Sequence, residues 1–266
     1  MPDAQSHFAQ HQNGDVHYET AGTGNTTLVL IHGWCCSARV WEHQLPLADK
    51  YRLILVDLPG HGRSPARADG TYSLEQSANA VRAVLDHAGV SRVTLVGHSM
   101  GGTVCTMFLR LHASLVERVL YIDSFFRAPE AYLTQAERQA KRALVSSDTN
   151  LARLLPAFCC SPHTPPSVLA AVIQMMVNDA STDVRLGTVM QDAWHAHALG
   201  RDECYPDIPA LHICTEKYSF VDVDWPRLLP RLEMDSSSWR DHGHFFFQED
   251  PERFNLQVEK VLSSGP

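Results

Sequence analysis

The stretch Val96-Gly97-His98-Ser99-Met100-Gly101-Gly102 decides how this chain is read, and its centre is Gly-x-Ser-x-Gly. An apolar run (93–96) precedes the motif and helix-compatible residues (103–111) follow it. A serine on a tight turn between a strand and a helix forms a nucleophile elbow, which exposes the hydroxyl above the sheet. The helix N-terminus beneath it stabilises negative charge. We therefore predict that Ser99 is a catalytic nucleophile and that the flanking glycines prevent backbone clashes.

Composition and charge limit the classes of protein to consider. The 266 residues, 44% hydrophobic and 20% charged, suit one large globular α/β domain. A formal charge of −8 argues against nucleic acid or an anionic membrane as partner. No signal-like or membrane-spanning run is found, so we expect a cytoplasmic protein. The seven cysteines are an odd number and include two adjacent pairs, which predicts reduced thiols and no structural metal.

Strand and helix patterns alternate over both ends of the chain. A hairpin is predicted within 8–20, around Asn13-Gly14. The apolar runs predict buried strands at 28–31, 53–57, 93–96, 119–123, 210–214 and near 231–234. Helices are expected at 40–48, from a Ser73 cap to 87, after the elbow, and at 251–262. This alternation predicts a mainly parallel sheet.

The middle of the chain has a different character. Strand signals vanish after 124, and four helical stretches follow, at about 130–146, 149–158, 166–178 and 182–198. We therefore predict a core of residues 1–124 and 202–266, and a helical cap of residues 125–201 inserted after the sixth strand. Such an insertion covers the carboxyl ends of the strands, where ligands bind in open α/β sheets.

Four motifs together resemble the α/β-hydrolase fold superfamily. They are His32-Gly33-Trp34, the run from Asp57 to Ser64, Gly97-His98-Ser99-Met100-Gly101, and Gly243-His244-Phe245 before the last helix. The resemblance covers essentially the whole chain. It implies an α/β fold with a mostly parallel eight-stranded sheet flanked by helices, and chemistry without a cofactor or metal. It does not fix the reaction, because this fold hosts many activities.

The nucleophile needs an adjacent base, since a serine hydroxyl is weakly nucleophilic at neutral pH. In the order typical of the superfamily the base comes last, after the final strand, which leaves His242 and His244. His244 directly follows a glycine and matches the resemblance, so we predict that it is the base and that His242 is a loop residue. His98 and His32 are expected to pack or to form structural hydrogen bonds rather than transfer protons.

The resemblance also assigns the oxyanion hole, which requires two backbone N–H groups aimed at the developing negative charge. It places one on Met100, after the nucleophile, and the other on Trp34. A small group of side chains is predicted to line the substrate pocket: Trp34, His98, Met176 and Trp194.

The acid of the triad departs from the commoner pattern, in which an aspartate follows the seventh strand in a Gly-x-x-Asp turn. Here that turn reads Thr215-Glu216-Lys217-Tyr218, and a tyrosine occupies the usual acid position. In a known variant the acid follows the sixth strand, where this chain has Asp123. A carboxylate at the end of a buried strand requires a partner such as the His244 imidazole. We therefore favour Asp123 over Glu216, with Asp222 and Asp224 requiring a shifted register.

These residues support two enzymatic hypotheses. In the first, a serine hydrolase cleaves an ester of a small to medium, fairly apolar substrate through an acyl-enzyme. In the second, the His244–Asp123 pair deprotonates a 3-hydroxy-4-quinolone ring that then reacts with O2, as in the cofactor-independent dioxygenases that the chain also resembles. A non-catalytic scaffold is the third class. The sequence leaves monomer and homodimer open.

Overall fold

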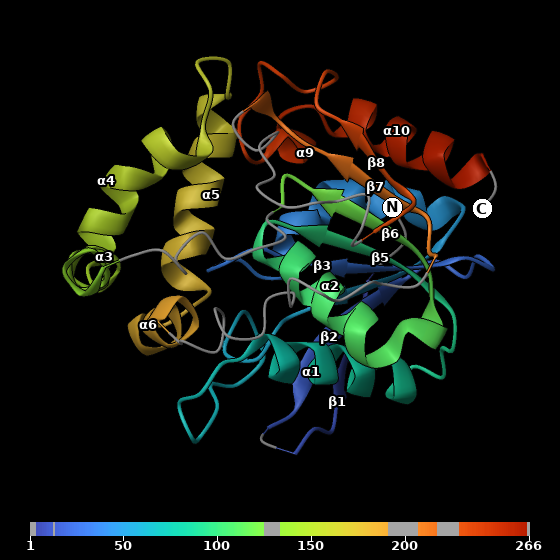
Figure 1. The fold of residues 1–266 in the computed structure, drawn as a ribbon, viewed down its shortest axis with the longest axis horizontal. Coiled ribbons are helices and arrows are strands. Elements are labelled where there is room, and N and C mark those ends of the chain that lie inside the picture. Colours follow the sequence, from blue (N-terminus) through green and yellow to red (C-terminus); the bar gives the residue numbers. More distant parts are fainter. Residues whose placement is uncertain (1–3, 13, 125–133, 191–206, 217–228, 265–266) are drawn as a thin grey trace.

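A computed structural model describes residues 4–12, 14–124, 134–190, 207–216 and 229–264. Within these residues eight strands form one sheet in the order β1-β2-β4-β3-β5-β6-β7-β8 (Figure 1). The β1–β2 and β2–β4 pairs are antiparallel and the other five are parallel, which confirms the predicted sheet. The strands are β1 Gln5–Ala9, β2 Val16–Ala21, β3 Thr27–Ile31, β4 Arg52–Val56, β5 Val93–His98, β6 Val116–Ile122, β7 Ala210–Ile213 and β8 Leu232–Asp235.

Helices cover both faces of the sheet, with α1 and α10 on opposite sides of it in Figure 1. The core helices are η1 Ala38–Asp49, α1 Leu74–His87, α2 Met100–His112, η2 Ala113–Leu115, α9 Phe246–Glu249 and α10 Pro251–Ser263. Strand β3 shows why both faces are apolar. Val29 and Ile31 join the cluster under α1 and α2, whereas Leu28 and Leu30 join the cluster on the other face. Successive residues of a strand point to opposite faces, so a doubly covered strand is apolar throughout.

Two helices differ in how well the sequence predicts them. The α1 helix begins at the predicted cap, where Ser73 Oγ accepts from Gln76 N at 3.1 Å and Gln76 Oε1 accepts from Ser73 N at 2.8 Å. The helix predicted at 40–48 is instead a 3₁₀ helix over Ala38–Asp49, with Pro46 inside it. Proline lacks the N–H that an α-helix requires and clashes with the carbonyl four residues earlier, which disfavours α geometry there.

Four helices between β6 and β7 form a group beside the sheet (Figure 1). They are α3 Gln135–Val145, α4 Asp148–Cys159, α5 Pro166–Asn178 and α6 Thr182–Met190. Hydrogen bonds join this helical segment to the core on both sides of α5. Gly62 N donates to Asp179 O at 2.8 Å, and His244 N donates to Cys159 O at 2.7 Å. Its function as a cap stays a prediction, and the predicted helix beyond 190 lies outside the described residues.

Candidate active site

Ser99 lies at the junction of β5 and α2 with φ 52° and ψ −118°. A serine at positive φ is strained and persists only where its surroundings hold it. Ser99 N donates to Ile122 O at 3.0 Å, and Ser124 Oγ donates to Ser99 O at 2.7 Å. The end of β6 therefore fixes the backbone of the elbow on both sides of Ser99. The sequence analysis did not single out Ser124, and only its position after a strand could have suggested it.

The glycines of the elbow are required by close backbone contacts. A Cβ on Gly97 would collide with the carbonyl of Gly101, and a Cβ on Gly101 would collide with the carbonyl of Ile31. A Cβ on Gly102 would collide with the Ser124 side chain. As expected, small residues around the serine let α2 start directly against the sheet.

His244 and Asp123 are in direct contact. Nδ1 of His244 donates to Oδ2 of Asp123 at 2.7 Å, with the two residues 5% and 0% exposed. Asp123 follows β6, and its backbone takes the uncommon φ of 42° while its N–H donates to Ile213 O at 2.8 Å. The carboxylate is thus held at the end of the sheet facing the loop that carries the histidine.

Thr215 completes the environment of the carboxylate. Its backbone N and its Oγ1 donate to Oδ1 of Asp123 at 2.7 and 2.9 Å. Both carboxylate oxygens therefore accept charge-assisted hydrogen bonds, which is how a buried carboxylate becomes stable. The sequence analysis missed Thr215 although it begins the turn after β7. The adjacent Glu216 is exposed, and Tyr218, Asp222 and Asp224 lie outside the described residues.

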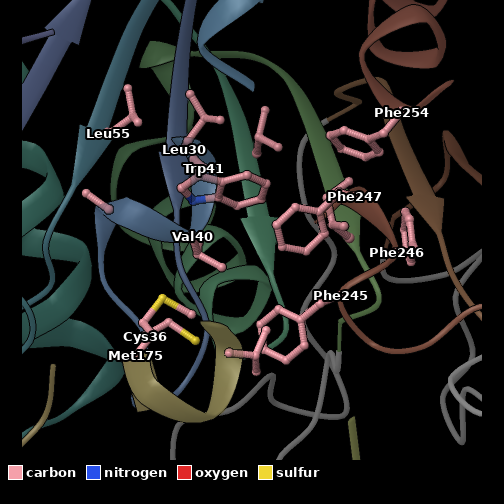
Figure 2. Close-up of a cluster of buried hydrophobic side chains, with 14 of the residues drawn as sticks. Leu30, Cys36, Val40, Trp41, Leu55, Met175, Phe245, Phe246, Phe247 and Phe254 are labelled. Atoms are coloured by element: carbon pink, nitrogen blue, oxygen red, sulfur yellow. The ribbon is translucent and has the colours of Figure 1, made fainter. Parts of the chain in front are cut away.

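The loop that carries His244 is fixed from several sides. The backbone carbonyl of His244 accepts a hydrogen bond from Nε2 of His98 at 2.9 Å. Behind it, the rings of Phe247 and Trp41 stack with centroids 4.7 Å apart, and the ring centroids of Phe245 and His98 lie 4.8 Å apart. Figure 2 shows Trp41, Phe245 and Phe247 within a cluster of buried hydrophobic side chains. These aromatic contacts limit the movement of the imidazole relative to the end of β5.

Three other histidines lie near the site, each with its own contacts. Burial, and then the neighbouring His244, hold the pKa of His98 well below its usual value, so its ring is neutral. His32 donates through Nδ1 to Gly33 O at 2.8 Å and accepts through Nε2 from Leu58 N at 3.0 Å. The His242 ring lies edge-on to the Trp239 ring, with centroids 4.9 Å apart. Among the described contacts, His242 forms no hydrogen bond with Asp123.

The loop after β3 packs directly on the elbow. A Cβ on Gly33 would lie 3.0 Å from Nδ1 of His98 and 3.2 Å from Cβ of Ser99, which is tighter than an ordinary contact, so glycine favours this close packing. Cys35 takes a φ of 60°, and Cys36 N donates to Gly33 O at 3.2 Å, which closes the turn around Trp34. The Trp34 indole Nε1 donates to Thr188 Oγ1 of α6 at 2.9 Å. The loop is thereby joined to the helical segment.

The remaining predicted site residues are placed as follows. Met100 is the first residue of α2 and is buried against the sheet. Met176, on α5, is buried in the same apolar cluster that Trp34 packs against. Figure 2 shows the neighbouring Met175 beside Cys36 in that cluster. Trp194 lies outside the described residues.

The described residues hold neither a metal-binding cluster nor a membrane-spanning helix. No cluster of three or more His, Cys, Asp or Glu side chains there is arranged to hold a metal ion. No helix among them has the length and apolar character needed to cross a bilayer.

Comparison with known sequences gives a family match and partial relatives. The profile of the alpha/beta hydrolase fold family matches residues 26–251. A pimeloyl-[acyl-carrier protein] methyl ester esterase of Sodalis glossinidius is 44% identical over 94 residues, which are 35% of this chain and 34% of that protein. A soluble epoxide hydrolase of Corynebacterium sp. strain C12 is 36% identical over 118 residues, 44% of this chain and 41% of the hydrolase. The matches span well under half the length of these relatives.

Solved structures resemble the chain over nearly its full length. An esterase from Thermogutta terrifontis superposes with a TM-score of 0.79 and 22% identity, covering 98% of both chains. The epoxide hydrolase CorEH gives a TM-score of 0.77 and 22% identity, covering 98% of this chain and 99% of the other. At this level of identity the resemblance concerns the fold.

Proposed function

Because the chain belongs to the alpha/beta hydrolase fold family, we propose that it is a serine hydrolase that cleaves esters through an acyl-enzyme. The observation that carries the proposal is the 2.7 Å contact between His244 and Asp123, beside a serine elbow at positive φ. A nucleophile, a base and a residue that orients the base are the minimum set for this chemistry. Similarity to esterases among the relatives supports the same reaction class.

In the proposed mechanism Ser99 Oγ attacks the ester carbonyl carbon while His244 takes its proton. Because Nδ1 of His244 donates to Asp123, the nitrogen available for that proton is Nε2. Asp123 holds this tautomer and stabilises the imidazolium that forms. His244 then protonates the leaving alcohol, and water repeats the sequence to release the acid. Because Asp123 contacts His244, we assign Asp123, rather than Glu216, as the acid of the triad.

The oxyanion is proposed to bind the backbone N–H groups of Met100 and Trp34. The first residues of a helix have N–H groups without intrahelical acceptors, and Met100 begins α2. Gly33 lies close to the Ser99 side chain, which supports the N–H of the adjacent Trp34 as the second donor. In a serine-protease example, removal of one oxyanion-hole donor lowers the catalytic constant by about 10²–10³-fold.

The substrate is proposed to be a small or medium-sized ester with an apolar acyl group. The helical segment contributes buried apolar side chains, including Met176, to a cluster against which Trp34 packs. Apolar pockets with a few polar groups select ligands of this kind. We assign Trp34, His98, Met176 and Trp194 to this pocket as a proposal, with residues 125–201 acting as its cap.

The test compares wild type with Ser99→Ala on a panel of esters and lactones, with the exposed Ser91→Ala as matched control. We expect Ser99→Ala to lose hydrolysis and to keep its thermal unfolding transition, whereas Ser91→Ala retains both. Retained turnover in Ser99→Ala would contradict the proposal. A parallel assay for O2-dependent loss of 3-hydroxy-4-quinolone absorbance with carbon monoxide release decides the dioxygenase alternative.

A further inference from the structure

A hydrogen-bonded series of serine, histidine and aspartate lies at the β1 edge of the sheet, away from Ser99. Ser6 Oγ is 2.9 Å from Nε2 of His17, and Nδ1 of His17 is 2.7 Å from Oδ2 of Asp57. The register explains the contact, because Phe8 of β1 pairs with His17 of β2. Residues two apart share a face of a strand, so Ser6 lies diagonal to His17 on the side of Phe8.

The buried half of this series is rigid. His17 and Asp57 are 0% and 2% exposed. Backbone N–H groups of Ala38 and Arg63 donate to the Asp57 carboxylate at 2.6 and 2.9 Å, and His17 N donates to Ser64 Oγ at 2.9 Å. Burial alone raises the pKa of Asp57, but the hydrogen bond from His17, the nearby His32 and these amides lower it overall.

The ionised carboxylate fixes the tautomer of His17. A carboxylate only accepts hydrogen bonds, so Nδ1 of His17 carries the proton in the neutral ring. Nε2 is then an acceptor, and the Ser6 hydroxyl donates to it. This is the order of hydrogen bonds by which a histidine activates a serine.

The exposed half of the series presents the serine to solvent beside a positive charge. Ser6 is exposed, and Nη1 of the exposed Arg63 donates to Ser6 Oγ at 2.9 Å. The Arg63 guanidinium lies 5.7 Å from the Phe8 ring, and that ring lies 5.1 Å from the His17 ring. Phe8 is 44% exposed and provides an apolar surface next to the hydroxyl. A guanidinium at this place stabilises negative charge that develops at the serine.

We propose that Ser6 is a second activated nucleophile, which accepts an acyl or phosphonyl group from a small activated ester. Ser6 Oγ forms a bond to the carbonyl carbon or phosphorus, and the bond to the leaving group breaks. The Ser6 proton passes to Nε2 of His17 and then to the leaving group. Asp57 is a positioning residue that holds the tautomer of His17. The assignment is independent of Ser99.

The experiment treats Ser99→Ala protein with a fluorophosphonate and locates the adduct by tandem mass spectrometry. We expect an adduct on Ser6 in Ser99→Ala and in the Ser91→Ala, Ser99→Ala control, and its loss in Ser6→Ala, Ser99→Ala. His17→Asn in the Ser99→Ala background keeps a donor toward Asp57 but removes Nε2, and should abolish labelling while circular dichroism stays native. An unlabelled Ser6 at millimolar probe, or undiminished labelling of folded His17→Asn, would overturn the proposal. In wild-type protein, labelling of Ser99 by the fluorophosphonate is measured separately, on the peptide that contains Ser99.

A thiol probe tests the same site without relying on a buried substitution. In Ser6→Cys the thiol would face His17 and Arg63, which favour a thiolate, whereas Ser91→Cys places a thiol at an ordinary exposed position. At pH 7 we expect iodoacetamide to alkylate Cys at position 6 about tenfold faster or more, measured on its own peptide. Equal rates for the two variants would overturn the proposal.

Discussion

Nδ1 of His244 and Oδ2 of Asp123 lie 2.7 Å apart, although 121 positions separate the two residues in the chain. The contact joins the loop after the last strand to the end of β6, two strands away from β8 in the sheet. It accounts for the buried carboxylate and fixes which nitrogen of His244 faces away from the acid.

The first prediction concerns the acid. Asp123→Asn should lower the catalytic constant by orders of magnitude, about 10⁴-fold in the serine-protease example of the same substitution, because an amide can hold the wrong tautomer of His244. Glu216→Gln is the matched control and should change the rate by less than about twofold, since Glu216 is exposed. Steady-state kinetics on a good ester substrate gives the answer. A larger loss in Glu216→Gln would reverse the assignment.

The second prediction separates two neighbouring histidines. His244→Ala should remove activity as fully as Ser99→Ala, because the nucleophile then lacks its base. His242→Ala should retain most of the catalytic constant, since its ring packs on Trp239 rather than on Asp123. The catalytic constants of both variants are measured on one substrate. Loss of activity in His242→Ala alone would show that His242, and not His244, is the base.

The third prediction concerns Thr215. Thr215→Val keeps the shape and the backbone donor but removes the hydroxyl that donates to Asp123 at 2.9 Å. A hydrogen bond to a charged group contributes about 1.5–3 kcal/mol, so the catalytic constant should fall about tenfold and urea stability should decrease. Thr215→Ser should restore both properties. If Thr215→Val matched wild type in rate and stability, the hydroxyl would have no role in supporting the acid.

The fourth prediction concerns the link between the helical segment and the loop after β3. Thr188→Val leaves the Trp34 indole without the acceptor that now lies 2.9 Å away. If the Trp34 backbone N–H stabilises the oxyanion, the catalytic constant should fall several-fold with a smaller change in KM, because the interaction is made mainly in the transition state. Thr188→Ser retains the hydroxyl and serves as control. An equal change in both parameters would indicate a general effect on binding.

The fifth prediction is a loss of stability in mild acid. Burial lowers the pKa of His212 to about 3, whereas the unfolded chain titrates near its ordinary value of about 6.5. Between these values the unfolded state binds more protons, so stability falls as the pH decreases below about 6.5 and is independent of this group above it. For one such histidine the free energy of unfolding should drop by about 2 kcal/mol from pH 7 to pH 5.

The control for this prediction is His212→Gln, which removes the titrating ring and keeps an acceptor for Ser124 N, now 3.3 Å from Nε2 of His212. The pH dependence of urea unfolding should shrink by about 2 kcal/mol over the same interval. An unchanged pH dependence would mean that His212 does not stay neutral in the folded protein. His61 is also buried, and burial together with the neighbouring His32 lowers its pKa to about 3. In His212→Gln, His61 should therefore leave a smaller decrease of stability in acid, of the same sign.

The fold could be predicted from the sequence because its signals are local. The apolar runs set the strands, and the Ser73–Gln76 capping box set the first residue of α1. The elbow glycines required a strand and a helix on either side of Ser99. Each of these signals lies within a few residues of the structure it determines, so no knowledge of distant contacts was needed. The 3₁₀ geometry around Pro46 was missed because a binary apolar pattern does not distinguish it from an α-helix.

The sequence alone determined that a serine elbow and a late histidine belong to an α/β sheet, because strand–turn–helix chemistry is encoded in neighbouring residues. It favoured Asp123 over Glu216 but did not decide between them, since their distance from His244 depends on how β6, β7 and the last loop meet. Only the tertiary structure placed Asp123 against His244 and added Thr215 to its other oxygen. The contacts between Ser6, His17 and Asp57 likewise depend on the tertiary structure, because the three residues belong to different segments of the chain. Side-chain contacts between distant strands follow from sheet order and register, which no local pattern specifies.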